Sequence, residues 1–176
     1  MSCGTWKRLV PEIVSNTSPL LYLYRIGTLD LLPRLFSKVW TSPAVSRELR
    51  EGQRKGYDVP DLQGFSWLEV TEPRTVSSQW LALDLGAGEL SVLSLALENP
   101  HWFVLLDDGL ARRVAQSAGL NVWGTLKILL EAQSRGLTGD LESLLDKLQD
   151  AGMWISEGVR RRVLALAKKE PGWPRP

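Results

Sequence analysis

The stretch that most constrains this chain is a short apolar run at residues 102–106, which stops at two adjacent carboxylates, Asp107 and Asp108. Five apolar residues, followed by Gly109 and a helical pattern, predict a strand that is buried on both faces of a parallel sheet. The carboxyl end of such a strand lies at the edge where open α/β sheets bind their ligands. Two neighbouring acids there favour a divalent cation, although the same acids could simply cap the next helix.

The preceding chain repeats a strand-to-helix step twice. Residues 12–15 are predicted to form a strand, with Ser18 as the N-cap and Pro19 as the first residue of the helix that follows. Residues 38–41 predict a second strand, with Ser42 as the cap of the next helix. Such alternation is typical of an α/β fold and not of a helix bundle.

The remaining periodicity predicts two more strands, at residues 67–70 and 119–123. Residues 52–64 contain three glycines and a proline, and they predict a loop that could act as a lid or contact a partner. The expected helices, in chain order, cover residues 20–26, 30–36, 44–51, 90–97, 110–118, 125–132, 141–148 and 159–169. We therefore expect one domain over residues 1–176, with a core at about 12–132 and a helical extension at about 140–169.

Composition excludes several classes of function. The net charge of +1 is not that of a strongly basic nucleic-acid binder, and the single cysteine, Cys3, allows no intramolecular disulfide. No run approaches the roughly 18 apolar residues that a membrane span needs, so we expect a cytoplasmic protein without a membrane partner. His101 is the only histidine, so a zinc site of the Cys/His type is excluded. Gly86 and Gly88 lack the third glycine of a dinucleotide-binding loop.

Oxygen-bearing side chains recur at successive strand-to-helix transitions. They are Asn16, Glu48, Glu89, Asp107 and Asp108. In a right-handed βαβ topology each transition falls on the same edge of the sheet, so side chains that are far apart in sequence should converge there. Oxygen-only ligands favour Mg²⁺ or Mn²⁺.

The order and spacing of these positions resemble the PIN domain, the fold of toxin ribonucleases in bacterial and archaeal toxin–antitoxin modules. The segments that carry the resemblance, which looks closest to a poorly characterised VapC-like branch, are residues 14–21, 25–32, 85–89, 106–113 and 124–126. Together they span about residues 12–168. The resemblance implies a three-layer α/β/α fold with a central, mostly parallel sheet and extra C-terminal helices.

The resemblance also implies a chemistry and a set of partners. Glu48, Glu89 and one of Asp107 and Asp108 would hold one or two Mg²⁺ or Mn²⁺ ions, which would activate a water for hydrolysis of RNA. Asn16 stands where PIN nucleases generally carry an aspartate, and its amide oxygen can still bind a hard cation. The implied RNA contacts are Thr17, Ser18, Arg112 and Thr125. A small antitoxin protein is the expected partner, and a homodimer is expected by analogy.

Two alternatives stay open. Asn16 replaces one acid, and Thr125 stands near the position of another, so the chain could be a catalytically impaired PIN-like module that binds RNA or a protein. In that case the basic residues of the final helix, Arg160, Arg161 and Arg162, would contact the partner. A metal-dependent phosphatase or another phosphodiesterase is the third option.

Overall fold

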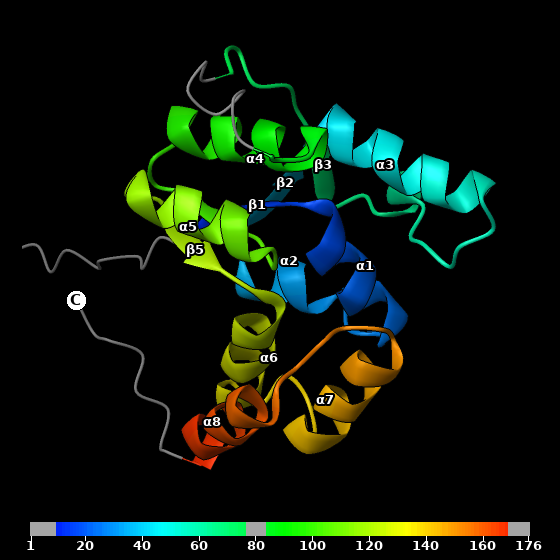
Figure 1. The fold of residues 1–176 in the computed structure, drawn as a ribbon, viewed down its shortest axis with the longest axis vertical. Helices are drawn as coiled ribbons and strands as arrows, with labels where there is room; N and C mark the ends of the chain where they lie inside the picture. The colour runs from blue at the N-terminus through cyan, green and yellow to red at the C-terminus, as the bar shows by residue number, and fades with distance from the viewer. Residues whose placement is uncertain (1–9, 77–83, 169–176) are drawn as a thin grey trace, which may run out of the picture.

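Five parallel strands form one central sheet in the computed structural model, which describes residues 10–76 and 84–168 (Figure 1). The strand order is β3-β2-β1-β4-β5. The strands are β1 Glu12–Ser15, β2 Lys38–Thr41, β3 Leu68–Val70, β4 Phe103–Leu105 and β5 Asn121–Trp123. Ile13 of the central strand lies beside Val39 on one side and Phe103 on the other. The prediction of an α/β fold with a mostly parallel sheet is confirmed.

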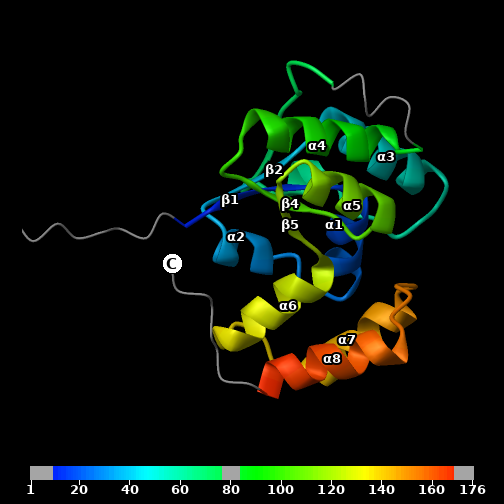
Figure 2. The same cartoon turned by 60° about the vertical axis from the view of Figure 1, so that its left-hand side comes forward.

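Helices cover both faces of the sheet, in three layers. The helices are α1 Thr17–Arg25, α2 Leu31–Leu35, α3 Pro43–Arg54, α4 Ala87–Glu98, α5 Gly109–Ser117, α6 Thr125–Ser134, α7 Leu141–Asp150 and α8 Glu157–Lys168, with a 3-10 turn η1 at Leu62–Gly64. Helices α4 and α5 lie on one face, whereas α1, α2 and α6 lie on the other (Figure 2). Helix α3 projects past the ends of the strands and contacts both α1 and α4 (Figure 1).

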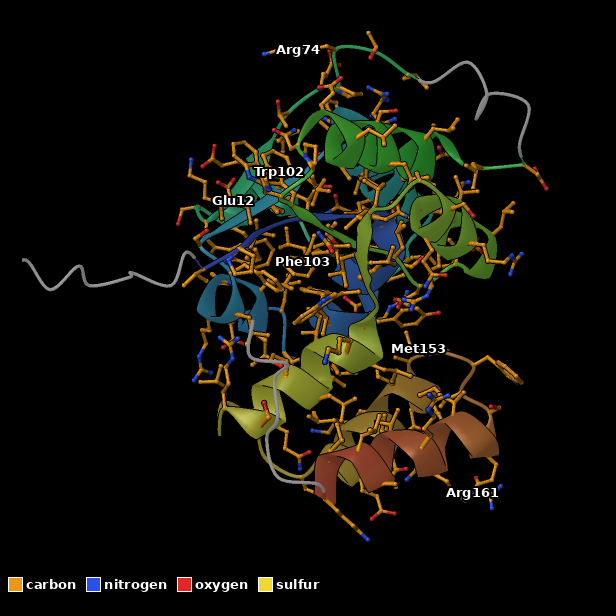
Figure 3. The ribbon with its side chains drawn as sticks, turned by 90° about the vertical axis from the view of Figure 1, so that its left-hand side faces the viewer. Glu12, Arg74, Trp102, Phe103, Met153 and Arg161 are labelled. Carbon is orange, nitrogen blue, oxygen red and sulfur yellow. The ribbon has the colours of Figure 1, made fainter. Side chains whose placement is uncertain are left out.

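The hydrophobic core lies on both faces of the sheet, because side chains along each strand point alternately to one face and to the other. Ile13, Val14, Val104 and Leu105 are completely buried because their strands have neighbours on both sides and helices on both faces. Consecutive residues of a strand point to opposite faces, and Trp102 and Phe103 extend this rule to the start of β4 (Figure 3). Their ring partners differ accordingly: Trp102 stacks on Trp40, and Phe103 packs with Phe36 and Trp123.

The last two helices pack on α6 beneath the sheet (Figure 2). Arg25, at the end of α1, connects them to the rest of the molecule by donating hydrogen bonds to the carbonyl oxygens of Asp58 (3.0 Å) and Ala151 (3.2 Å). Arg160 of α8 forms ion pairs with Asp146 (2.7 Å) and Glu142 (3.6 Å) of α7. Arg160 therefore joins α7 to α8, so it is not a free cation for RNA.

Two sequence predictions about element boundaries are wrong. The helix after β1 begins at Thr17, so Asn16 is its cap residue, whereas Ser18 and Pro19 lie in its first turn. The reason is that the Asn16 N–H donates to the carbonyl of Leu105 (3.1 Å), which keeps the chain extended through Asn16. The predicted loop at 52–64 is shorter than expected, because α3 continues to Arg54 and the turn η1 forms over Leu62–Gly64.

The structure confirms one helix cap that the sequence predicts, whereas another expectation falls on residues that it does not describe. The Ser42 side chain accepts a hydrogen bond from the N–H of Val45 (3.2 Å), which confirms Ser42 as the cap of α3. The expectation for Cys3 lies outside the described residues. Within residues 10–76 and 84–168, the structure has no helix with the length and apolar character of a membrane span.

Candidate active site

The predicted polar side chains gather where the order of the strands reverses. The chain moves from β1 to β2 on one side of the sheet and from β4 to β5 on the other, so helices leave β1 and β4 on opposite faces. Asn16 directly follows β1, and Asp107 and Asp108 follow β4 after Leu106. Such a switch point is where open α/β sheets form their binding crevice.

Glu48 extends from α3 toward this switch point, which we call the crevice, and both of its carboxylate oxygens accept hydrogen bonds. The Gly88 N–H, in the first turn of α4, donates to Oε1 (2.8 Å), and the Thr17 hydroxyl donates to Oε2. The start of α4 carries the positive end of the helix dipole, which stabilises a carboxylate there. Glu51, one turn further along α3, is exposed and pairs with Lys55 at 2.8 Å. Glu48 is therefore the glutamate of α3 that lies beside Asn16 and the start of α4.

Asn16 converges with Glu48 on one spot at Gly88. A Cβ atom added to Gly88 would lie 2.7 and 2.8 Å from the two Glu48 carboxylate oxygens and 2.8 Å from Asn16 Oδ1. Asn16 is only 5% exposed, and its Oδ1 accepts no hydrogen bond from any described residue. A buried carbonyl oxygen without a partner beside a carboxylate is electrostatically unfavourable. A hard cation between them would reverse the sign of that interaction.

The close approach at Gly88 leads to a first prediction. We expect Gly88→Ala to lower the free energy of unfolding by about 1–3 kcal/mol, because the new methyl group forces Glu48 and Asn16 apart. Urea denaturation measures this change. Gly158→Ala is a matched control, since Gly158 is also the second residue of its helix but has open space around its Cβ position. A Gly88→Ala variant as stable as the control would contradict the crowded geometry.

Glu89 is the next acid around the crevice. Its carboxylate accepts a hydrogen bond from the Gly86 N–H (2.9 Å), and it lies near the negative charges of Asp108, Glu48 and Asp84. Burial and these three charges raise the pKa of Glu89, although the bond from Gly86 acts in the opposite direction. The Glu89 carboxylate is therefore repelled by three other negative charges, and a cation beside it would offset that repulsion.

This shift gives a pH prediction for the metal-free protein. Because folding raises the pKa of Glu89, the folded state binds more protons than the unfolded state just above the usual glutamate pKa, so stability falls as pH rises through that window. Glu89→Gln removes the carboxyl group, so we expect the variant to unfold at a higher temperature than the parent at pH 7, by an amount that shrinks near pH 4. Thermal unfolding across this range measures the difference. Equal profiles would mean that Glu89 is not held among negative charges.

The adjacent acids after β4 have different partners. Asp107 turns toward α6, where its two oxygens accept hydrogen bonds from the N–H (2.8 Å) and the hydroxyl (2.6 Å) of Thr125. Burial raises the pKa of Asp107, against these bonds and the nearby Arg112. Asp108 is exposed and caps α5 through one oxygen, Oδ1, which accepts from the N–H groups of Leu110 and Ala111. Of the pair, only Asp108 contributes to the negative field at Glu89.

The implied RNA contacts are mostly engaged within the protein. Thr17 donates to Glu48, and Thr125 is completely buried against Asp107. The guanidinium of Arg112 donates to the carbonyl oxygen of Leu106 (2.9 Å) and lies close to Gly124. Ser18 is partly exposed in the first turn of α1. The geometry therefore gives Thr17, Thr125 and Arg112 a supporting role around the acids, and their contact with RNA stays a prediction.

The donor set fits a hard divalent cation, but it is incomplete as a preformed cage. Within residues 10–76 and 84–168, no three His, Cys, Asp or Glu side chains come close enough together to hold a metal ion by themselves. The orphaned amide oxygen of Asn16 beside the Glu48 carboxylate is the feature that fits a cation. Asp84, which sequence analysis did not single out, adds a further negative charge near Glu89. A pattern of acids at strand ends could not reveal Asp84, because it lies before a helix in irregular chain.

Comparison with known families agrees with this geometry. A family model described as a PIN domain matches residues 12–169, nearly the whole chain. The chain belongs to the PIN-domain family. A search of the curated proteins found no match. PIN domains are generally nucleases that use divalent metal ions.

Proposed function

We propose that this PIN domain is a metal-dependent endoribonuclease that hydrolyses phosphodiester bonds of RNA in the crevice formed by Asn16, Glu48, Glu89 and Asp108. The observation that carries the proposal is the buried Asn16 oxygen, which has no hydrogen-bond partner among the described residues and lies near the same spot as the Glu48 carboxylate. A cation between Asn16 Oδ1 and the Glu48 carboxylate would turn the repulsion between these oxygens into attraction to a shared positive charge.

The chain's own residues prepare this site. Thr17 and Gly88 fix the Glu48 carboxylate, and the Gly86 N–H fixes one oxygen of Glu89. Asp108 keeps one oxygen free of the helix-capping bonds that its other oxygen accepts. A bound Mg²⁺ or Mn²⁺ would lower the pKa of a water and neutralise charge on the scissile phosphate. Asn16, Glu48, Glu89 and Asp108 would hold the metal ion. Because the metal-bound water would attack the phosphate, no protein nucleophile is needed.

We further propose that the protein is the toxin of a toxin–antitoxin module and that a small antitoxin protein restrains it. The support is the resemblance of residues 14–21, 85–89 and 106–113 to a VapC-like branch. A short open reading frame next to the gene, encoding a protein that binds this chain and blocks cleavage, is the expected observation. A chain that cleaves RNA but whose gene has no such neighbour would be a nuclease outside toxin–antitoxin systems.

Cleavage of a labelled single-stranded oligoribonucleotide tests the enzymatic proposal. We expect products with Mn²⁺ or Mg²⁺ and none after EDTA treatment, with activity restored when the metal is added back. A deoxyribonucleotide of the same sequence and p-nitrophenyl phosphate should remain intact. Turnover of the small phosphoester without RNA cleavage would point to the phosphatase option.

A second candidate is a PIN-like module that binds RNA without cleaving it. It is favoured by Asn16, which removes one negative charge, and by the absence of a three-acid cluster among the described residues. This candidate predicts salt-sensitive RNA binding that survives EDTA and the loss of Glu89. Metal-dependent cleavage that disappears with Glu89 would exclude it.

A further inference from the structure

A second pocket lies on the other side of α3 from Glu48. It has a volume of about 370 Å³ and is formed by α3, the segment around η1 and the edge strand β3. Leu49 and Phe65 supply apolar walls, and the side chains of Arg50, Gln53, Gln63 and Asp61 line the same space. Leu49, Arg50 and Gln53 share one helical face, whereas Glu48 lies on the opposite face of the same helix. The pocket is therefore separate from the acidic crevice but shares a wall with it.

Three arginines follow one another on α3, and the middle one, Arg50, lines this pocket. Arg47, Arg50 and Arg54 follow one another at spacings of three and four residues, which places them in one stripe of α3 about 10 Å long. All three are exposed, and none forms an ion pair with another described residue. Glu51 of the same helix forms its ion pair with Lys55 (2.8 Å), and the charge of Arg54 also acts on it. Unpaired guanidinium groups spaced along a helix suit the successive phosphates of a nucleic-acid strand.

We propose that this pocket binds one unpaired base of the RNA substrate, while the arginine stripe of Arg47, Arg50 and Arg54 holds the adjoining phosphates. The inference rests on the proposed ribonuclease function and adds a base-recognition subsite to it. A partly buried Phe65 offers an aromatic ring for base contact, and the amide groups of Gln53 and Gln63 can donate to and accept from base edges.

The chemistry of the lining favours RNA over a protein segment. Seven apolar residues line the pocket, and two serines, two glutamines, an arginine and an aspartate share the lining. A mixed lining of this kind suits a base, which has apolar faces and polar edges, better than a purely apolar peptide anchor. Asp61 already caps η1 by accepting from the Gln63 N–H (3.1 Å), so its charge is partly satisfied. Since α3 is about 10 Å across, the bound base would belong to a nucleotide beside the scissile phosphate and not at it.

The test measures binding without cleavage. In the Glu89→Gln background with EDTA, fluorescence anisotropy gives the Kd of labelled octamers of uridine, adenosine and cytidine. We expect Arg50→Ala combined with Gln53→Ala to weaken the preferred octamer about tenfold or more, and Gln63→Ala to bring the three Kd values closer together. Arg47→Ala should weaken all three octamers by the same factor and reduce the salt dependence.

Matched controls lie outside α3 and its pocket. Arg74, in the connection after β3 (Figure 3), and Gln116 of α5 are both exposed, so Arg74→Ala combined with Gln116→Ala should change each Kd less than twofold. Ser66→Trp, which places a large ring at the pocket mouth, should abolish the base preference. Pocket variants that bind all three octamers like the parent would overturn the subsite, as would a parent that binds none of them. Salt-sensitive binding of polyglutamate in place of RNA would assign the groove to an acidic protein partner.

The ribonuclease proposal and the base-subsite proposal can be contradicted independently of each other. If the wild-type protein cleaves RNA and the pocket variants bind normally, only the base subsite is wrong. If the pocket variants lose binding and the wild-type protein never cleaves RNA with any metal, the nuclease proposal is wrong and the subsite stands as part of an RNA-binding module.

Discussion

Replacing Glu89 with glutamine should lower the rate of RNA cleavage by about 10³-fold, because it removes a negative charge that interacts with those of Asp108 and Glu48. The glutamine oxygen can still accept the hydrogen bond from the Gly86 N–H, so the start of α4 keeps its geometry. The variant should also be the more stable protein at pH 7, for the electrostatic reason given above. Loss of activity in a stabilised variant cannot come from unfolding.

The measurement is the single-turnover rate on a labelled oligoribonucleotide at saturating Mn²⁺. Glu69→Gln is the matched control, since Glu69 is exposed on the edge strand β3, and its rate should stay within twofold of the parent. A Glu89→Gln rate within tenfold of the parent would remove Glu89 from the site. The family membership would be unaffected by that outcome.

Asn16→Asp should have opposite effects with and without metal. In the metal-free protein the new carboxylate is buried next to Glu48, and we expect the free energy of unfolding to fall by about 3 kcal/mol. With Mn²⁺ the added charge becomes a ligand, so the Kd for Mn²⁺ should decrease by about tenfold or more. Cleavage at low Mn²⁺ concentration should increase accordingly.

Thermal unfolding with and without Mn²⁺, together with calorimetric titration, separates these effects. Asn121→Asp is the control, because Asn121 is exposed and is the first residue of β5. It therefore lies at the amino ends of the strands, whereas the crevice lies at their carboxyl ends. An Asn16→Asp variant that is destabilised but gains no affinity for Mn²⁺ would mean that the Asn16 oxygen faces no cation. That result would favour the non-catalytic module.

Much of the fold follows from sequence because its strands are buried and its helices are capped in regular ways. The apolar runs around Val14 and Val104 predict parallel strands, and Ser42 predicts the start of α3. The start of α1 was missed because a long-range hydrogen bond from Asn16 to Leu105 sets it, and local preference for Ser18 as a cap does not compete with that bond. The length of α3 was missed because Gly52, an apparent helix stop, is instead packed against Val59.

The sequence predicted that certain polar side chains approach one another, but not which groups each of them contacts. The topology brings Asn16 and Glu48 together, as the spacing of strand-to-helix transitions predicts. The choice between Asp107 and Asp108 depends on the chain's direction after β4, which places Asp107 against Thr125 and leaves Asp108 near Glu89. The Gly88 N–H donates the hydrogen bond that holds one oxygen of the Glu48 carboxylate. Because it is a backbone group, a pattern of side chains in the sequence could not predict this contact.

Calorimetric titration of Mn²⁺ into the purified protein tests the central claim most directly, because it asks whether the crevice binds a cation without requiring the correct RNA. We expect saturable binding in the parent, binding at least tenfold weaker in Glu48→Gln, and retained binding in Asp107→Asn, whose carboxylate is directed at Thr125. Saturable binding that Glu48→Gln leaves unchanged, or no heat of binding in the parent at millimolar Mn²⁺, would contradict a metal site at Asn16 and Glu48.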